Sequence, residues 1–247
     1  VEVDFQIYNV LPEDLEKTVS YLRESKDGFT VTMPYKIKIM EYCDELDESA
    51  KKCGSANTIL VNNGRLKGFN TDGWGMVKSL SLKGVDFKDK TVTMVGAGGV
   101  ASSIAYHLLV HGVKKVKVLN VIQDELDRLL NRMGDTFEGA ILNEENLVNY
   151  TKDSDIFINA SILGQVGYDD YKDFGFLDGL KKDGIVFDVN YSNPDAGLPK
   201  AAKEKGLTSY VGKAMSSCQG IRAMEIWTGK APSDEAAREL VREIESK

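Results

Sequence analysis

Histidine and cysteine, the side chains that most often bind zinc and other transition metals, are scarce in this 247-residue chain, with two histidines and three cysteines. The cysteines are Cys43, Cys53 and Cys218. They are odd in number, widely spaced and without a CxxC pair, so we expect free thiols and no structural zinc. His107 and His111 lie four residues apart, but HLLVH lacks the glutamate of a zinc protease motif, and we expect no metal there.

An excess of basic residues and a long apolar run are also missing. The chain has 31 Lys and Arg against 38 Asp and Glu, a net charge of −7. This balance opposes binding to phosphate backbones, so we expect a small-molecule ligand and no nucleic acid. No apolar run approaches the roughly 20 residues that span a bilayer, and VEVDFQIYNV is too short and acidic for a secretory leader. We expect a cytoplasmic protein that does not contact membranes, either a monomer or a homodimer.

The first third of the sequence predicts a small α/β unit. The expected elements are a strand over 1–10, a helix after Pro12 with Leu15, Val19 and Leu22 on one face, a strand in GFTVTMP, a helix over 35–53, and two strands around an Asn-Asn-Gly turn in ANTILVNNGRLKGFNT. Because the chain opens on valine inside a strand-like stretch, we expect the natural protein to begin further upstream.

The middle of the chain alternates between strands and helices, which is typical of a parallel sheet. The expected strands are KTVTMVGAGG, KVKVLNV, DIFINAS and GIVFDVNY, and VASSIAYHLLVHG is the expected helix between the first two. AMSSCQGIRAMEIWTG and SDEAARELVREIESK predict two closing helices. We therefore expect an α/β fold with two domains.

VGAGGVAS, residues 95–102, predicts a dinucleotide site. A glycine-rich turn between a strand and a helix lets backbone N–H groups approach a pyrophosphate, and here Gly96, Gly98 and Gly99 form the turn, with Ala101 in the third fingerprint position. The end of the next strand should distinguish the cofactors, by an acid for NAD or an arginine for NADP. Asn120 and Val121 stand there instead, so both cofactors remain open.

Two charged residues lie at the edges of predicted elements. Lys36 follows Pro34 by two residues, and Asp72 lies within GFNTDGWG, just before a predicted helix. A lysine beside a carboxylate can pass a proton to or from a substrate hydroxyl. The alternative is an ordinary surface salt bridge.

The order and spacing of seven motifs resemble those of shikimate dehydrogenases. The motifs are VTMPYK, GSANT, GFNTDGWG, VGAGGVAS, INASILG, FDVNYSNP and GKAMSSCQG followed by WTG, and together they run from about residue 8 to residue 229. The resemblance implies reduction of 3-dehydroshikimate to shikimate by a nicotinamide cofactor, in the pathway to aromatic amino acids. It implies a substrate domain (1–72 and 214–247) and a Rossmann-like, doubly wound dinucleotide domain (73–213), with the C-terminal helices returning to the first domain.

The resemblance also implies roles for individual residues. Lys36 and Asp72 match the proton-transfer pair. The positions that match substrate contacts are Thr32, Asn57, Tyr191 and Gln219. The positions that match cofactor contacts are Gly96, Ala97, Gly98, Gly99, Val100, Asn120, Val189, Gly212 and Met215.

The sequence departs from the family in two places that bear on function. The family's N-terminal SxSP motif, which holds the substrate carboxylate, is absent, and Val121 stands where NADP-using members carry an arginine. We therefore expect a weakened preference for NADP and use of NAD, because the 2′-phosphate loses a bidentate partner. Two alternatives remain open: a quinate/shikimate dehydrogenase that uses NAD, and a non-catalytic homologue that senses shikimate or a dinucleotide.

Overall fold

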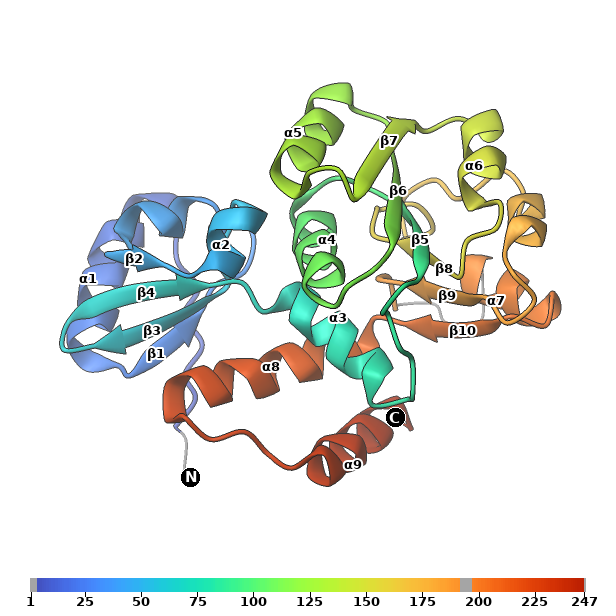
Figure 1. Ribbon diagram of the computed structural model, residues 1–247. Coiled ribbons are helices and arrows are strands. Elements are labelled where there is room, and N and C mark those ends of the chain that lie inside the picture. The colour runs from blue at the N-terminus through green and yellow to red at the C-terminus, as the bar shows by residue number, and fades with distance from the viewer. Residues whose placement is uncertain (1–3, 192–196, 247) are drawn as a thin grey trace.

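The computed structural model describes residues 4–191 and 197–246, and Figure 1 shows two sheets in this part of the chain, joined by helices. The smaller sheet has the order β1-β3-β4-β2. Its strands are β1 (Gly28–Thr30), β2 (Glu45–Leu46), β3 (Thr58–Asn62) and β4 (Arg65–Phe69). β3 pairs antiparallel with β1 and β4, while β2 runs parallel to β4.

The hairpin between β3 and β4 is the predicted one. Asn63 and Gly64 both have positive φ angles, 50° and 72°, as a two-residue turn that matches the twist of the flanking strands requires. Helix α1 (Leu15–Ser25) follows the short 3₁₀ helix η1 (Pro12–Asp14) and packs Leu15 and Val19 against this sheet, as its apolar spacing predicted.

Two sequence expectations in this region are wrong. Residues 35–53 do not form one helix, but the 3₁₀ helix η2 (Lys38–Tyr42), strand β2 and helix α2 (Glu48–Cys53). The amides of Asp44 and Asp47 donate to main-chain carbonyls of β4, so these donors pair with the sheet instead of a helix. Residues 4–10 form no strand, and neither sheet of the described chain pairs with them.

The larger sheet is entirely parallel, with the order β10-β9-β8-β5-β6-β7. Its strands are β5 (Thr91–Val95), β6 (Lys115–Asn120), β7 (Phe137–Ile141), β8 (Ile156–Asn159), β9 (Ile185–Asp188) and β10 (Thr208–Val211). The chain winds outward from β5 to β7, then returns to β8 on the other side of β5. This is the expected doubly wound arrangement, and its switch point lies between β5 and β8.

Helices cover both faces of this sheet. Alternate side chains of the central strands belong to two cores, because successive residues point to opposite faces. One core packs against α3 (Asp72–Ser81), α4 (Gly99–Val110) and α5 (Gln123–Met133). The other packs against α6 (Glu144–Thr151), η3 (Gly175–Gly179) and α7 (Gly197–Glu204).

The C-terminal region returns to the smaller sheet, as expected. Helix α8 (Lys213–Thr228) begins beside the large sheet and ends below the small one (Figure 1), where the Trp227 indole N–H donates to the Ile59 carbonyl at 2.9 Å. Helix α9 (Asp234–Glu245) packs beside α8, and its Asp234 pairs with Lys78 of α3 at 2.6 Å. Helices α3 and α8 therefore connect the two sheets.

Candidate active site

The stretch GFNTDGWG places Asp72 where three parts of the fold meet. Asp72 is the first residue of α3, and the two glycines after it allow that helix to approach its neighbours closely. A Cβ on Gly73 would lie 2.1 Å from the Ser103 carbonyl oxygen of α4, and one on Gly75 would lie 2.5 Å from the Met215 carbonyl oxygen of α8. Both positions therefore exclude a side chain.

The Asp72 carboxylate is buried and has two charged or polar partners. The Lys36 Nζ lies 2.7 Å from Asp72 Oδ2, and the Asn57 Nδ2 donates to Asp72 Oδ1 at 2.7 Å. The Asp72 side chain is 5% exposed and the Lys36 side chain 23% exposed, so the lysine is the more accessible member of the pair. The structure thus brings together the two residues that the sequence singled out, although they lie 36 positions apart.

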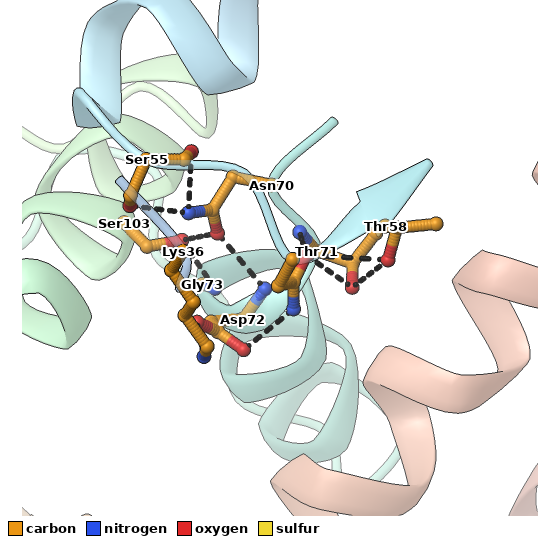
Figure 2. A network of polar contacts seen from close by, with 9 residues as sticks. Lys36, Ser55, Thr58, Asn70, Thr71, Asp72, Gly73 and Ser103 are labelled. Atoms are coloured by element: carbon orange, nitrogen blue, oxygen red, sulfur yellow. Dashed lines mark hydrogen bonds and ion pairs between the residues drawn. The ribbon is translucent and has the colours of Figure 1, made fainter. Parts of the chain in front are cut away.

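Asparagine side chains fix the backbone around Asp72 (Figure 2). Asn57 Oδ1 accepts from the Thr71 amide at 2.9 Å, while Asn70 Oδ1 accepts from the Asp72 amide at 3.2 Å and from Ser103 Oγ at 2.7 Å. Asn70 Nδ2 donates to the carbonyl and hydroxyl oxygens of Ser55, both at 3.0 Å. Sequence reasoning did not assign Ser55, Asn70 or Ser103. Asn70 and Ser55 lie inside quoted motifs, whereas no local signal marks Ser103.

A cavity of about 1390 Å³ opens beside this ion pair. Four residues predicted to face the substrate or transfer its proton line it, namely Thr32, Lys36, Asn57 and Gln219. Gln219 comes from α8 and the others from the smaller sheet and its loops, so the cavity lies between these elements. Tyr191 is not among its lining residues; it follows β9 and is 55% exposed.

The glycine turn fits a pyrophosphate. Gly96 has a φ of 113°, and a Cβ there would meet the Ala160 carbonyl oxygen at 2.5 Å, so this glycine lets β5 and the end of β8 lie close together. Gly98 and Gly99 are exposed, and no atom lies within 4 Å of a Cβ added to either. Helix α4 starts at Gly99 without a side-chain cap, so its first N–H groups are available to an anion.

Apart from Asn120, the remaining predicted cofactor residues lie at three places. Val189 follows β9 and Gly212 precedes α8, so close together that a Cβ on Gly212 would lie 2.2 Å from the Val189 carbonyl oxygen. Met215 is buried in the core beneath α3 and α4. Ala97 and Val100 belong to the glycine turn and the first turn of α4.

Asn120 ends β6, at the position from which a side chain would contact the cofactor's ribose. Its side-chain amide donates to the Ile122 carbonyl at 2.9 Å and to Glu125 Oε2 at 3.1 Å. Val121 is 67% exposed, and the sequence from 118 to 127 contains no lysine or arginine. Lys115 pairs with Glu138, and the Lys117 ammonium donates to the main-chain carbonyls of Tyr150 and Lys152 at the end of α6, so neither lies at this end of the strand.

Asp188 is a buried acid that sequence reasoning missed. It ends β9, and Oδ1 accepts from Asn159 Nδ2 at 2.9 Å and from the Asn190 amide at 3.0 Å. Burial is the largest influence on it and raises the pKa of this carboxyl to about 7. Residues 192–194 of the FDVNYSNP motif lie outside the described residues.

Of the two histidines considered for metal binding, His107 is buried and His111 is exposed, and Cys218 is also buried. His107 is 7% exposed, and burial lowers its pKa to about 4. Cys218 is free and fully buried, and burial raises its pKa to about 11. Across residues 4–191 and 197–246, no group of three or more His, Cys, Asp or Glu side chains is placed to hold a metal ion. No helix in the same ranges is long and apolar enough to cross a membrane.

Comparison with known proteins assigns the two parts of the chain separately. The profile of the shikimate dehydrogenase substrate binding domain matches residues 1–59, and that of shikimate / quinate 5-dehydrogenase matches residues 79–165. The shikimate dehydrogenase (NADP(+)) of Alkaliphilus metalliredigens is 34% identical, over 92% of this chain and 81% of its own. The corresponding enzyme of Streptococcus gordonii is 36% identical, over 96% and 85%.

A solved structure extends this likeness to three dimensions. Shikimate 5-dehydrogenase from Listeria monocytogenes, in complex with shikimate and NAD, superimposes with a TM-score of 0.83 and 28% identity. The superposition covers 95% of this chain and 84% of that one. The similarity therefore includes both sheets and the helices between them.

Proposed function

The chain belongs to the shikimate dehydrogenase family, and we propose that it catalyses reversible hydride transfer between NAD(P)H and 3-dehydroshikimate, giving shikimate. The observation that carries this proposal is the partly buried ion pair of Lys36 and Asp72 at the edge of a large cavity. The helix that follows the glycine turn packs against Gly73, the residue after Asp72.

The ion pair of Lys36 and Asp72 suits the proton-transfer step of a ketone reduction. Bound NAD(P)H would supply a hydride to the carbonyl carbon, and negative charge would then develop on the carbonyl oxygen. The Lys36 ammonium stabilises this charge and donates the proton, since it lines the cavity and is held from behind by Asp72. Asp72 orients the ammonium, because its carboxylate is fixed by Asn57 and by the start of α3.

Neutral polar groups around Lys36 suit a polyhydroxylated ring. Thr32, Asn57 and Gln219 line the same cavity and provide hydroxyl and amide groups for ring hydroxyls. Tyr191 is assigned to the substrate from the end of β9. A substrate analogue that lacks one hydroxyl would leave one of these groups without a hydrogen-bond partner. The enzyme should therefore bind such an analogue much more weakly than the substrate.

We assign residues 1–72 and 214–247 to the substrate domain and 73–213 to the dinucleotide domain. The smaller sheet lies within the first range and the larger sheet within the second. The hydrogen bond from Trp227 to Ile59 supports placing the end of α8 with the first domain.

The cofactor would bind along the carboxyl ends of the large sheet. The pyrophosphate would lie against Gly96 to Val100, and the ribose would lie against Asn120. The nicotinamide would lie near Val189, Gly212 and Met215. We propose that the enzyme uses NAD and has a weakened preference for NADP, although the relatives from Alkaliphilus metalliredigens and Streptococcus gordonii are named NADP(+) enzymes. Val121 provides no cation for a 2′-phosphate, and Asp124 and Glu125 would repel it.

The proposed reaction is tested by absorbance at 340 nm, with shikimate and each oxidised cofactor. We expect turnover in the wild type and a loss of kcat of about 10²- to 10⁴-fold in Lys36→Ala, the usual contribution of a general acid. Lys38→Ala is the matched control, since Lys38 is exposed and pairs with Glu41 on the surface. Absence of turnover in the wild type with either cofactor would favour a sensing homologue, and faster oxidation of quinate than of shikimate would assign the other substrate.

Cofactor choice requires kcat/KM for NADPH and NADH with 3-dehydroshikimate. We expect comparable values or a preference for NADH. A preference of about a thousandfold for NADPH would contradict the proposal, because such discrimination needs a cationic partner for the 2′-phosphate.

A further inference from the structure

Ser103 joins the helix of the glycine turn to the backbone around Asp72. It lies on α4 and is fully buried. Its hydroxyl donates to Asn70 Oδ1 at 2.7 Å and accepts from the Gly73 amide at 2.7 Å (Figure 2). These two partners are separated in sequence by Thr71 and Asp72, so one hydroxyl binds the chain on both sides of the acid.

The Asn70 amide continues this connection. Its Oδ1 also accepts from the Asp72 amide, and its Nδ2 is held by two oxygens of Ser55. Asn70 and Ser55 are buried, so these hydrogen bonds do not compete with bulk water. The contacts form a continuous polar path from α4 through Ser103 and Asn70 to Asp72 and its ion pair with Lys36.

We propose that Ser103 is a positioning residue that fixes Asp72, and through it Lys36, relative to the helix on which the dinucleotide binds. The inference rests on the proposed function, in which hydride and proton reach adjacent atoms of one carbonyl group. A cofactor held at the glycine turn would deliver hydride from the side of α4 and Lys36 would donate the proton, so their relative placement must be held within a fraction of an ångström. The contact of Gly73 with the backbone of α4 brings the two helices together, and the Ser103 hydroxyl sets their register.

Ser103→Ala separates this role from binding. We expect kcat to fall about 10- to 100-fold, because the Gly73 amide loses its acceptor and Asn70 loses a donor. The dissociation constant of NADH, from its fluorescence, should change less than about twofold, since the glycine turn is untouched. Ser79→Ala is the control: Ser79 is a buried serine on α3 whose hydroxyl bonds only within its own helix, to Met76 at 2.8 Å, and its loss should leave kcat unchanged.

A double-mutant cycle tests whether Ser103 acts through Asn70. The losses of kcat in Ser103→Ala and Asn70→Ala should not multiply in the double variant, because both break the same path. Multiplicative losses would overturn the proposal. A Ser103→Ala enzyme whose kcat stays within about threefold of the wild-type value would also overturn it.

Amide hydrogen exchange provides a readout that does not depend on turnover. In Ser103→Ala, the amides of Asp72 and Gly73 should exchange at least about tenfold faster, and they should keep wild-type rates in Ser79→Ala. Unchanged exchange in Ser103→Ala would overturn the positioning role. If the wild type does not oxidise shikimate with either cofactor, the proposed function fails, and the exchange rates alone then decide whether Ser103 fixes Asp72.

Discussion

The replacement Gly73→Ala tests the packing that places Asp72. The added methyl carbon would lie 2.1 Å from the Ser103 carbonyl oxygen, 2.4 Å from its carbon and 2.7 Å from the Ile104 nitrogen. All three are backbone atoms of α4, so no side chain can rotate to make room. An ordinary contact begins near 3.4 Å, so α3 and α4 must separate by roughly 1 Å.

The expected cost follows from two opposing effects. Overpacking in a tight core costs about 1–3 kcal/mol, and the higher helix propensity of alanine returns up to about 1 kcal/mol. We therefore expect the free energy of unfolding to fall by about 1–2 kcal/mol, measured by urea denaturation. A displacement of about 1 Å at Asp72 should lower kcat about 100-fold.

Gly220→Ala is the matched control for this prediction. Gly220 lies within α8, and no atom lies within 4 Å of a Cβ added to it. Without a clash, the alanine should raise the free energy of unfolding by about 0.5–1 kcal/mol. If Gly73→Ala were as stable as Gly220→Ala and kept its kcat, the close approach of α3 to α4 could not be what positions Asp72.

Three further predictions concern the cofactor, the return of α8 and the dependence of stability on pH. Val121→Arg should raise kcat/KM for NADPH relative to NADH about 10- to 100-fold, and an unchanged ratio would place the 2′-phosphate elsewhere. Trp227→Phe removes the hydrogen bond to Ile59 and should lower the free energy of unfolding by about 1–2 kcal/mol in urea; no loss would mean that the bond contributes nothing. Because the pKa of Asp188 is raised from 3.8 to about 7, the folded protein keeps a proton that the unfolded chain releases, so stability falls as pH rises through that range. Asp188→Asn should reduce this fall, and an identical pH profile of unfolding would contradict the assignment.

Motifs with a local physical cause were predicted well from the sequence. The Asn-Asn-Gly hairpin depends on positive φ angles at Asn63 and Gly64, and the glycine turn depends on a strand that runs directly into an uncapped helix. Both requirements are met by residues adjacent in sequence. The order of the motifs also led to Lys36 and Asp72, which the fold brings within 2.7 Å.

Elements whose conformation depends on distant partners were predicted poorly. The apolar spacing of residues 35–53 suits a helix, yet the amides of Asp44 and Asp47 pair with β4 and divide the segment into three. The periodicity of residues 4–10 suits a strand, but a strand requires a hydrogen-bonded partner strand, and neither sheet of the described residues pairs with this segment. Propensity and periodicity describe one segment at a time and do not include this competition for backbone hydrogen bonds.

The sequence by itself determined the fold class, the glycine turn and the identity of the two charged residues at the site, because each of these follows from residue types at a fixed spacing. Only the tertiary structure decided that Asn57 holds Asp72, that Ser103 bonds the chain on both sides of that acid, and that the Asp188 carboxyl is buried enough to raise its pKa. Ser103 lies about thirty residues from its partners, and the sequence around a serine within a helix does not indicate its hydrogen-bond partners. Burial and hydrogen bonding arise from the packing of whole helices and sheets, and they become visible only when those elements are placed together.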